Sequence, residues 1–437
     1  MKPMKISKYN IVIPTLEEDI LYNCRTDVMV QVNERLMQLY QKYEQAPEEI
    51  GKIAPPFYEY LCNNGFIVEQ QNDETELISG RWIKEDTESK NLNRAVNPTM
   101  NCNLKCWYCY EKHRRSSYMK PNTIHALVEY LKKQIHEKKY QQINLSFFGG
   151  EPLLYFQQTV RPFLDELEKI KSNKVKFSIH FTTNATLLTP EIFDYLRPWK
   201  PDFQITLDGD EFIHNLVKKL GSGKRSAYQI VISRIKMIAE HHQHVLIRLN
   251  YTAKTLERFI NILDDLKSIP DEEKQHCNIS FHRIWQDNKI PDFELRESLQ
   301  KIEDAFRKEH FFVDSQTSRV IDRCYADKEN SIVINYDGAV YKCTARDFNA
   351  KNREGQLLSD GGVEWNARHE QRQLIRYGND TCKACILFAI CHGGCSQTKL
   401  ETEVQEGGCL KGFTNEDKID YIRKRIEDLY NEHKTNR

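Results

Sequence analysis

Three cysteines stand close together in the segment NPTMNCNLKCWYCYE, residues 97–111. Cys102, Cys106 and Cys109 follow the spacing C-x3-C-x2-C, and Tyr108 precedes the last of them. Three thiolates on one short loop can hold three corners of a [4Fe–4S] cube and leave the fourth iron open. Iron–sulfur clusters are normally held by four cysteines, so an incomplete set indicates chemistry at the open iron. For the loop alone, a zinc knuckle or scattered structural thiols is the alternative.

A second group of cysteines lies in the last third of the chain. Its spacing is C-x13-G-x4-C through Gly338, a gap, C-x2-C-x5-C-x3-C, a second gap and a final cysteine. In a reducing compartment such groups indicate metal or cluster ligands rather than disulfides. The run C-x2-C…C-x3-C could by itself be a zinc ribbon. The seven cysteines are Cys324, Cys343, Cys382, Cys385, Cys391, Cys395 and Cys409. The other three, Cys24, Cys62 and Cys277, are predicted to be small buried hydrophobic residues.

The elements that must position the first cysteine loop alternate between strand and helix patterns from residue 94 to about 285. This alternation predicts a parallel α/β architecture, with amphipathic helices such as 121–138 and 159–171. The six predicted strands are 94–98, 143–148, 176–181, 202–207, 245–250 and 278–282. In barrels built this way, the functional residues lie on the loops at the C-terminal ends of the strands.

Nearly every other candidate motif follows one of these strands. Glycines at 149 and 150 allow the backbone to approach a ligand closely. Asp208 precedes a glycine, so a turn is the alternative to a binding role. Arg248 and Asn250 alternate onto one face of the fifth strand. The candidate residues past the strands are Gly149, Gly150, Glu151, Thr183, Asn184, Asp208, Arg248 and Asn250.

The cysteine loop, GGEP at 149–152, TTNAT at 182–186 and LDG at 207–209 followed by His214-Asn215 resemble the radical S-adenosylmethionine (SAM) superfamily. The resemblance implies a partial (β/α)6 TIM-like barrel and SAM on the open iron. It places the SAM amino group at the GGEP loop and the ribose and carboxylate near 182–186. Ala185 replaces the usual glycine, so that loop could be built differently.

The same resemblance assigns the remaining contacts. Asp208 would contact the ribose or a peptide. Arg248 would pair with the SAM carboxylate, with a structural salt bridge as the alternative. Tyr108 and Asn250 complete the predicted cofactor site. The sequence does not identify the catalytic acid or base.

The C-terminal spacing resembles the SPASM domain of radical SAM enzymes over its whole length. This implies two auxiliary [4Fe–4S] clusters and three clusters in all. Cys382, Cys385, Cys391 and Cys409 would close the outer cluster. Cys324, Cys343 and Cys395 would hold the inner one, leaving an open iron or a non-cysteine ligand.

Residues 1–93 are predicted to form a small α+β domain, with strands near 9–13, 20–22 and 28–32, helices from Asn33 and Pro55, and a polar linker over 71–93. The pattern resembles the winged-helix domains that recognise leader peptides, which bind as an added strand; a structural cap is the alternative. The predicted domains are 1–93, 94–310 and 311–437, the last ending in a helix over 415–434 whose apolar face packs inward.

The composition argues against nucleic acid and membranes as partners. Lys+Arg and Asp+Glu both number 63, so no global charge attracts nucleic acid or an anionic membrane. No apolar run approaches the roughly 18 residues of a membrane span, and the start MKPMKISKYN lacks a signal-peptide core. A cytoplasmic protein with neither partner is expected.

The resemblance implies one-electron chemistry, with flavodoxin or ferredoxin as donor and SAM as the source of a 5′-deoxyadenosyl radical. The predicted function is a maturase that forms an intramolecular thioether or carbon–carbon crosslink in a ribosomally made precursor peptide. An anaerobic sulfatase maturase is disfavoured because Thr344, rather than an aspartate, follows Cys343 and the nearest downstream aspartate is Asp347. A peptide epimerase, a methyltransferase and a non-catalytic iron–sulfur electron carrier are further candidates. The precursor, the residues modified, the general base and the oligomeric state are left open.

Overall fold

The computed structural model describes residues 2–15, 18–138, 140–220, 226–287, 290–314, 323–402 and 408–435. The chain divides into two compact units that are each assembled from distant segments. One unit contains Met1–Glu88, Thr317–Glu329 and Glu370–Arg437, and the other contains Ser89–Gln316 and Asn330–His369. The N-terminal residues therefore share a unit with the C-terminal cysteine-rich segment, while the central α/β region forms the second unit.

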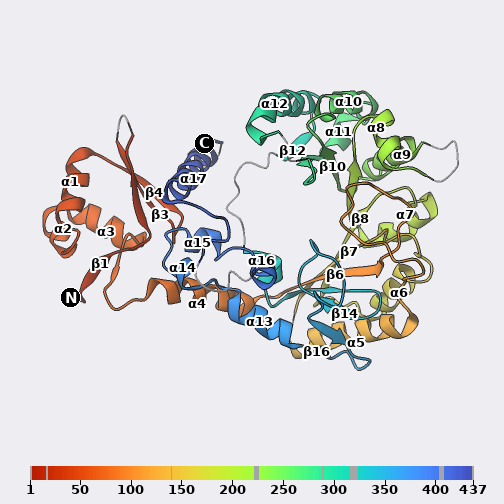
Figure 1. The fold of residues 1–437 in the computed structure, drawn as a ribbon, viewed down its shortest axis with the longest axis horizontal. Coiled ribbons are helices and arrows are strands. Elements are labelled where there is room, and N and C mark those ends of the chain that lie inside the picture. Colours follow the sequence, from red (N-terminus) through yellow and green to blue (C-terminus); the bar gives the residue numbers. More distant parts are fainter. Residues whose placement is uncertain are drawn as a thin grey trace. The chain divides into compact units, whose positions relative to one another are not determined.

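The second unit is built on a large sheet, mostly parallel, that contains all six predicted strands (Figure 1). These are β6 (Asn91–Thr99), β7 (Gln142–Gly149), β8 (Lys176–Thr183), β9 (Asp202–Leu207), β10 (Val245–Tyr251) and β11 (Cys277–Arg283). Each pairs in parallel with the next. The predicted fold class, a partial TIM-like barrel, is confirmed, because parallel neighbours require the crossover helices that the alternating pattern predicts.

Further strands extend both edges of this sheet. The strands β12 (Phe312–Asp314) and β13 (Ser331–Ile334) add in parallel at opposite ends. Beyond β13 follow the antiparallel strands β14 (Ala339–Tyr341), β15 (Gly355–Leu357) and β16 (Val363–Trp365). The sequence did not predict these short strands.

Helices surround the outer face of the sheet (Figure 1). They are α5 (Pro121–Glu137), α6 (Val160–Ile170), α7 (Pro190–Leu196), α8 (Glu211–Val217), α9 (Ala227–Glu240), α10 (Ile260–Leu266), α11 (Asp271–Lys274) and α12 (Asp292–Lys308). Side chains of Thr189, Asp210 and Ser226 cap the first turns of α7, α8 and α9, the preferred residue types for that position. Inside the sheet, the rings of Phe147 and Phe181 stack with centroids 4.8 Å apart.

The N-terminal part of the first unit holds the three predicted strands as an antiparallel sheet. Its order is β2 (Asn10–Ile13), β3 (Asp19–Asn23) and β4 (Val28–Val32). Asn33 caps α1 (Glu34–Lys42) by accepting from the Leu36 amide at 3.0 Å, as predicted. The helices α2 (Glu48–Ile53) and α3 (Pro55–Asn63) follow, and β1 (Met4–Ile6) pairs with β5 (Ile67–Glu69).

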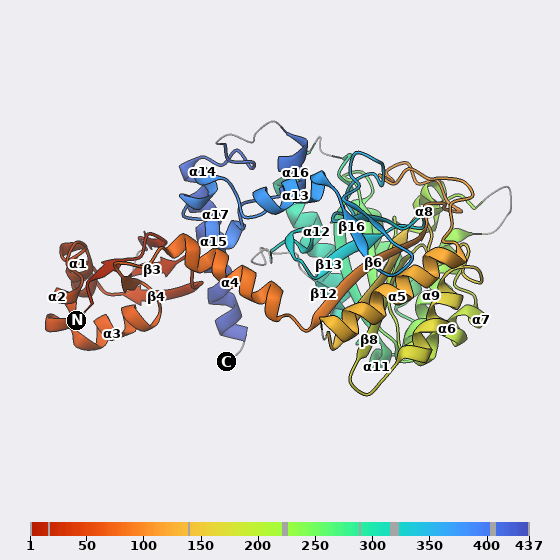
Figure 2. The same cartoon turned by 90° about the horizontal axis from the view of Figure 1, so that it is seen from below.

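Residues 71–93, predicted as a linker from their polar composition, contain instead the 15-residue helix α4 (Glu74–Glu88), as Figure 2 shows. Ile78 and Trp82 lie one turn apart on its buried face. The Trp82 ring packs against Phe388 with centroids 5.2 Å apart. Two apolar residues at i and i+4 are enough to form one buried stripe on a helix. The average composition of the segment is polar, so it does not reveal these two residues.

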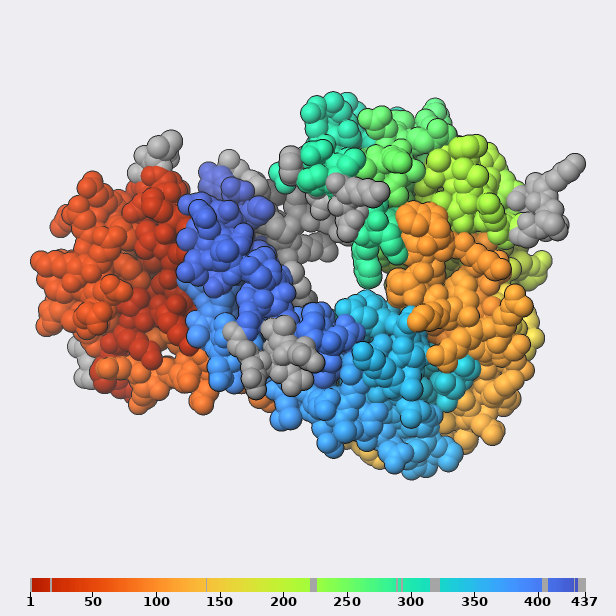
Figure 3. Space-filling model, viewed as in Figure 1, coloured from red at the N-terminus to blue at the C-terminus, as the bar shows by residue number. Residues whose placement is uncertain are grey.

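The rest of the first unit consists of short helices and one long one. They are α13 (Ala367–Ile375), α14 (Asp380–Lys383), α15 (Phe388–Cys391), α16 (Ser396–Glu401) and α17 (Asn415–Thr435). Ile422, Ile426 and Leu429 of α17 are buried, which confirms its predicted inward face. C-terminal residues pack directly on the N-terminal sheet (Figure 3), where Arg425 pairs with Asp27 at 2.5 Å. Within the described residues, no helix is long and apolar enough to cross a membrane.

Candidate functional site

A cavity of about 220 Å³ opens at the C-terminal ends of the parallel strands. It gathers predicted residues that are up to 148 positions apart in the chain, because parallel strands present their C-terminal loops at one edge. Two predicted residues, Glu151 and Asp208, lie outside its lining. Those that line it are Cys102, Cys106, Tyr108, Cys109, Gly149, Gly150, Thr183, Asn184, Arg248 and Asn250.

The two glycines at the end of β7 lie directly against the chain that leads into the cysteine loop. The Gly150 amide donates to the Thr99 carbonyl at 3.0 Å, and the Glu151 amide donates to the Asn101 carbonyl at 2.9 Å. A Cβ on Gly150 would lie 2.1 Å from the Asn101 oxygen. Gly149 adopts φ +102°, a conformation that side chains disfavour. Only glycines therefore allow this approach.

Glu151 lies behind the cavity wall and joins two loops. It is fully buried. One carboxylate oxygen accepts from the Leu153 amide at 3.0 Å and the Thr183 hydroxyl at 2.7 Å, and the other accepts from the Asn184 amide at 2.9 Å. Burial raises the pKa of this carboxyl, and these three donors oppose the rise. Glu151 thus positions the loops after β7 and β8.

The loop after β8 brings an amide to the first cysteine. The Asn184 side chain lies 3.8 Å from the Cys102 sulfur and donates to Asn103 Oδ1 at 3.0 Å. Ala185, which stands where the resemblance has glycine, adopts φ +59°. The left-handed conformation is therefore kept, although a side chain there costs about 1–2 kcal/mol.

Asp208, at the end of β9, is buried in a charged network. Its carboxylate pairs with Lys218 Nζ at 3.2 Å and accepts from the Tyr108 hydroxyl at 2.5 Å. Asn250 donates to the same hydroxyl at 3.2 Å. Burial and the neighbouring Asp208 charge raise the pKa of Tyr108, so the phenol stays a hydrogen-bond donor. The network ties the cysteine loop to β9 and β10.

Arg248 provides a cation in the cavity. Its Nε donates to Asn250 Oδ1 at 3.0 Å, and burial lowers its pKa. Among the described residues no carboxylate forms an ion pair with it, so the alternative of a structural salt bridge has no support there. An arginine fork is suited to a carboxylate ligand.

Sequence reasoning missed several residues of the cavity. Lys218 and Glu111 both line it and are buried. In the described part of the chain neither carboxylate oxygen of Glu111 has a hydrogen-bond partner, and burial, with Asp347 adding, raises its pKa to about 8. Tyr110 and Trp285 stack with centroids 5.7 Å apart and also line the cavity. Glu111 ends the quoted cysteine segment, two residues after Cys109, so its position was the available signal.

The cysteine trio fits a cluster better than a single ion. Burial raises the pKa of the Cys102 thiol to about 12 and that of Cys106 to about 11, and such thiols ionise only beside a cation or metal. A zinc ion with Zn–S bonds of about 2.3 Å holds its sulfurs about 4 Å apart. Among the described residues, the trio is not a set of atoms all within 4.8 Å of one another. At least one pair of these sulfurs is therefore farther apart than a single zinc ion would hold it.

Comparison with known proteins decides the family of this region. Residues 96–266 match the model of the Radical SAM superfamily. This segment is a radical SAM domain. SAM and a cluster at Cys102, Cys106 and Cys109 are the cofactors that this family implies, and the cavity has the thiols, glycine backbone and cation to hold them.

Relatives match beyond the radical SAM domain. The radical SAM cyclopropyl synthase TigE of Paramaledivibacter caminithermalis is 24% identical, over 87% of this chain and 81% of its own. A cysteine-type anaerobic sulfatase-maturating enzyme of Clostridium novyi is 22% identical, over 71% of this chain and 89% of its own. The structure of Streptococcus suis SuiB bound to the precursor peptide SuiA has a TM-score of 0.50 and 19% identity, covering 92% of this chain and 97% of SuiB. The last likeness shows the fold alone.

Outside the radical SAM domain, four C-terminal cysteines line one cavity of about 50 Å³. They are Cys382, Cys385, Cys391 and Cys409, the four that the resemblance assigns to the outer cluster. Leu387, Phe388 and Phe413 form its apolar walls. Cys395 is absent from this lining although it completes the zinc-ribbon spacing in the sequence. The arrangement therefore favours the predicted set over a simple ribbon.

The three cysteines assigned to the inner cluster lie in both units. Cys324 and Cys395 belong to the first unit and Cys343 to the second. Cys395 precedes α16, and its sulfur lies 3.5 Å from the Thr398 amide. The number of clusters and the inner ligand set stay predictions. Cys24 and Cys277 are buried as predicted, and Cys62 is partly buried.

Proposed function

We propose that this chain is a radical SAM maturase that modifies a ribosomally synthesised precursor peptide, forming an intramolecular thioether or carbon–carbon crosslink. The observation that carries the proposal is the cavity that joins the cysteine trio, the glycine loop and the Arg248 cation. The relative named as a cyclopropyl synthase supports the carbon–carbon alternative. The likeness to SuiB, solved with a precursor peptide, extends over 92% of this chain and so includes N-terminal residues.

When bound, SAM and the cluster supply a 5′-deoxyadenosyl radical that removes a hydrogen atom from the peptide. Cys102, Cys106 and Cys109 would hold the cluster, and the Gly149–Gly150 backbone would accept hydrogen bonds from the SAM ammonium. Arg248 would pair with the SAM carboxylate. The stacked rings of Tyr110 and Trp285 line the cavity and present an apolar surface to its contents.

The leader of the precursor would add to the N-terminal sheet. The strand β4 is an edge strand in the order β2-β3-β4, and its residues Val28, Met29 and Val30 are only half-buried. An apolar edge with unpaired backbone groups readily accepts another strand. A flavodoxin or ferredoxin is the proposed electron donor.

Mass spectrometry of the peptide product tests the proposal. The protein is reconstituted anaerobically, reduced and given SAM together with the peptide encoded by a short neighbouring open reading frame. A crosslink removes two hydrogen atoms from the peptide, methylation adds one carbon and epimerisation leaves the mass unchanged. An electron carrier yields no 5′-deoxyadenosine. A crosslinked product without an aldehyde supports the proposal, and an unchanged peptide under SAM cleavage contradicts it.

Cysteine variants separate the two cluster regions. Cys106→Ala should abolish SAM cleavage, whereas Cys391→Ala should keep some cleavage and lose peptide product. Cys62→Ala removes a thiol that lies outside both cluster regions, and it serves as the matched control. If Cys106→Ala still forms 5′-deoxyadenosine, the assignment of the first loop is wrong.

An anaerobic sulfatase maturase is the second candidate, because the Clostridium novyi relative carries that name. Oxidation of serine to formylglycine also removes two hydrogen atoms, so for a serine substrate mass alone does not separate it from a crosslink. A cysteine substrate would also exchange its sulfur for oxygen, which the mass reveals. A hydrazine probe captures the aldehyde and leaves a crosslink untouched. The Thr344 that follows Cys343 disfavours this candidate.

A further inference from the structure

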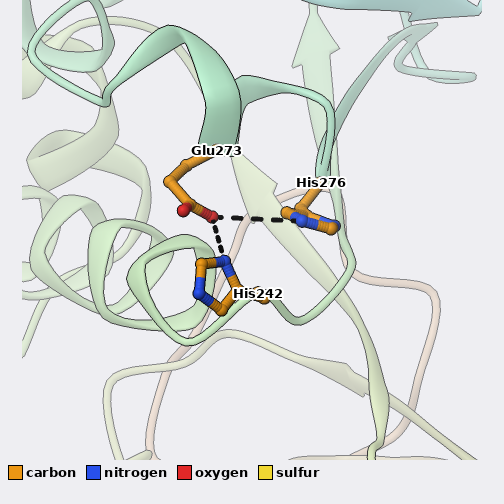
Figure 4. A group of neighbouring side chains, drawn as sticks. All are labelled: His242, Glu273 and His276. Atoms are coloured by element: carbon orange, nitrogen blue, oxygen red, sulfur yellow. Dashed lines mark hydrogen bonds and ion pairs between the residues drawn. The ribbon is translucent and has the colours of Figure 1, made fainter.

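Two histidines and a glutamate meet at the N-terminal ends of β10 and β11 (Figure 4). His242 lies in the turn between α9 and β10, Glu273 in α11, and His276 directly before β11. The candidate cavity lies at the opposite, C-terminal ends of the same strands. A seven-residue strand spans roughly 20 Å, so this group is separate from the radical SAM site.

One carboxylate oxygen lies between the two imidazoles. Glu273 Oε2 is 2.8 Å from His242 Nδ1 and 3.9 Å from His276 Nε2, and the three donor atoms all lie within 4.8 Å of one another. Among the residues that the structure describes, this is the one such group of three. Two imidazole nitrogens and a carboxylate oxygen are a common ligand set for zinc.

The backbone holds two of the ligands in place. The His276 amide donates to the Glu273 carbonyl at 3.0 Å, and the His276 carbonyl accepts from the Val245 amide at 2.8 Å. The Glu273 side chain is only 10% exposed. His242 is 71% exposed, so it can adjust by rotation when an ion binds. A fixed pair with one adjustable ligand needs little reorganisation to become a three-ligand site.

Neighbouring cations do not neutralise Glu273. Lys274, the next residue, pairs with Asp271 at 2.7 Å. His244 pairs with Asp202 at 3.3 Å. The Glu273 carboxylate therefore meets only the two histidines among the described residues, and a divalent cation would satisfy all three donors at once.

We propose that His242, Glu273 and His276 bind a divalent metal ion, Zn²⁺ by preference, with a fourth position left to water. Zinc takes four ligands in a tetrahedron, and nitrogen and oxygen donors at about 2.0–2.2 Å suit it. The ion would tie the turn after α9 to α11 and so brace the N-terminal rim of the sheet. The site does not take part in the chemistry at the other end.

The test uses the full chain with its clusters reconstituted, so that the cysteines are occupied. The protein is equilibrated with micromolar Zn²⁺, passed through gel filtration and analysed for zinc by mass spectrometry. Wild type and the control His244→Ala should retain about one zinc more per chain than His242→Ala or His276→Ala. His242 is exposed, so its variant keeps the fold, and circular dichroism checks this.

X-ray absorption at the zinc edge identifies the ligands of the retained ion. A shell of nitrogen and oxygen at about 2.0–2.1 Å supports the site, whereas a sulfur shell at about 2.3 Å means zinc on cysteines and overturns it. Equal zinc content in wild type and both histidine variants overturns it as well. Zinc should also raise the melting temperature of wild type and His244→Ala but leave that of His242→Ala unchanged.

Discussion

Replacing Gly150 by alanine would push apart two loops that line the proposed SAM site. Gly150 follows β7, and the chain opposite it is the Asn101 backbone, one residue before Cys102. The added Cβ would lie 2.1 Å from the Asn101 oxygen and 2.5 Å from its carbonyl carbon. Both atoms belong to the backbone, so no side-chain rotation relieves the clash.

The size of the effect follows from this geometry. Ordinary contact begins near 3.4 Å, so the two loops must separate by about 1 Å, a misplacement that can cost about 100-fold in rate. Overpacking typically costs about 1–3 kcal/mol. Loss of the hydrogen bond from the Glu151 amide to the Asn101 carbonyl adds about 1 kcal/mol.

The assay is 5′-deoxyadenosine formation by reconstituted, reduced protein with saturating SAM, together with iron content. We expect Gly150→Ala to be slower by about 100-fold. Gly80→Ala is the matched control, because Gly80 is exposed inside α4 and a Cβ there meets nothing within 4 Å. That control should keep full activity and gain about 1 kcal/mol in stability.

One result would refute the reasoning. If Gly150→Ala loads iron and cleaves SAM within about threefold of wild type, the close approach of the two loops is not needed for the site. Loss of activity in Gly80→Ala would instead show that alanine substitution is not a specific probe.

Three further substitutions have expected outcomes of different kinds. Glu111→Met replaces a buried carboxyl that has no hydrogen-bond partner among the described residues. Denaturant titration should show that the free energy of unfolding rises by about 1–3 kcal/mol, while peptide turnover falls. Unchanged turnover would exclude Glu111 from the site. Lys218→Met leaves the buried Asp208 without its ion-pair partner, so unfolding should show a loss of about 3–5 kcal/mol, and a loss below 1 kcal/mol would contradict the pairing. Burial, with Arg248 adding, lowers the pKa of His282 from 6.5 to about 4; the unfolded chain binds the extra proton between these values, so stability is full above pH 6.5 and falls as the pH decreases toward 4. His282→Gln should flatten that slope in denaturant titrations, and an unchanged slope would assign it to another group.

Local pattern was sufficient for the elements that carry the site. The six strands of the barrel appear within a few residues of their predicted bounds, because each is a short run of alternating or continuous apolar residues. Asn33 and Thr159 stand at the starts of their helices. The helix α4 was missed because its buried stripe consists of few apolar residues within a polar segment.

The motifs also carried the chemistry that depends on residue type. The three cysteines of the first loop, the glycine pair, Arg248 and Asn250 all line the cavity. Glu151 belongs to the same motif but lies behind the wall, joined to Thr183 and Asn184. Sequence shows that a residue follows a strand, and burial decides whether its side chain faces the ligand or the core.

Sequence alone thus placed the chemistry-bearing loops after successive strands and marked the two groups of cysteines. Only the tertiary structure decided that Glu111 and Lys218 enter the cavity, whereas the resemblance had already grouped Cys409 with Cys382, as the lining of the C-terminal cavity does. The tertiary structure also brought His242 to Glu273, 31 residues away in the chain, and to His276. The physical reason is that periodicity and spacing are properties of neighbours along the chain, whereas a binding site is made by side chains that meet only after the strands have paired.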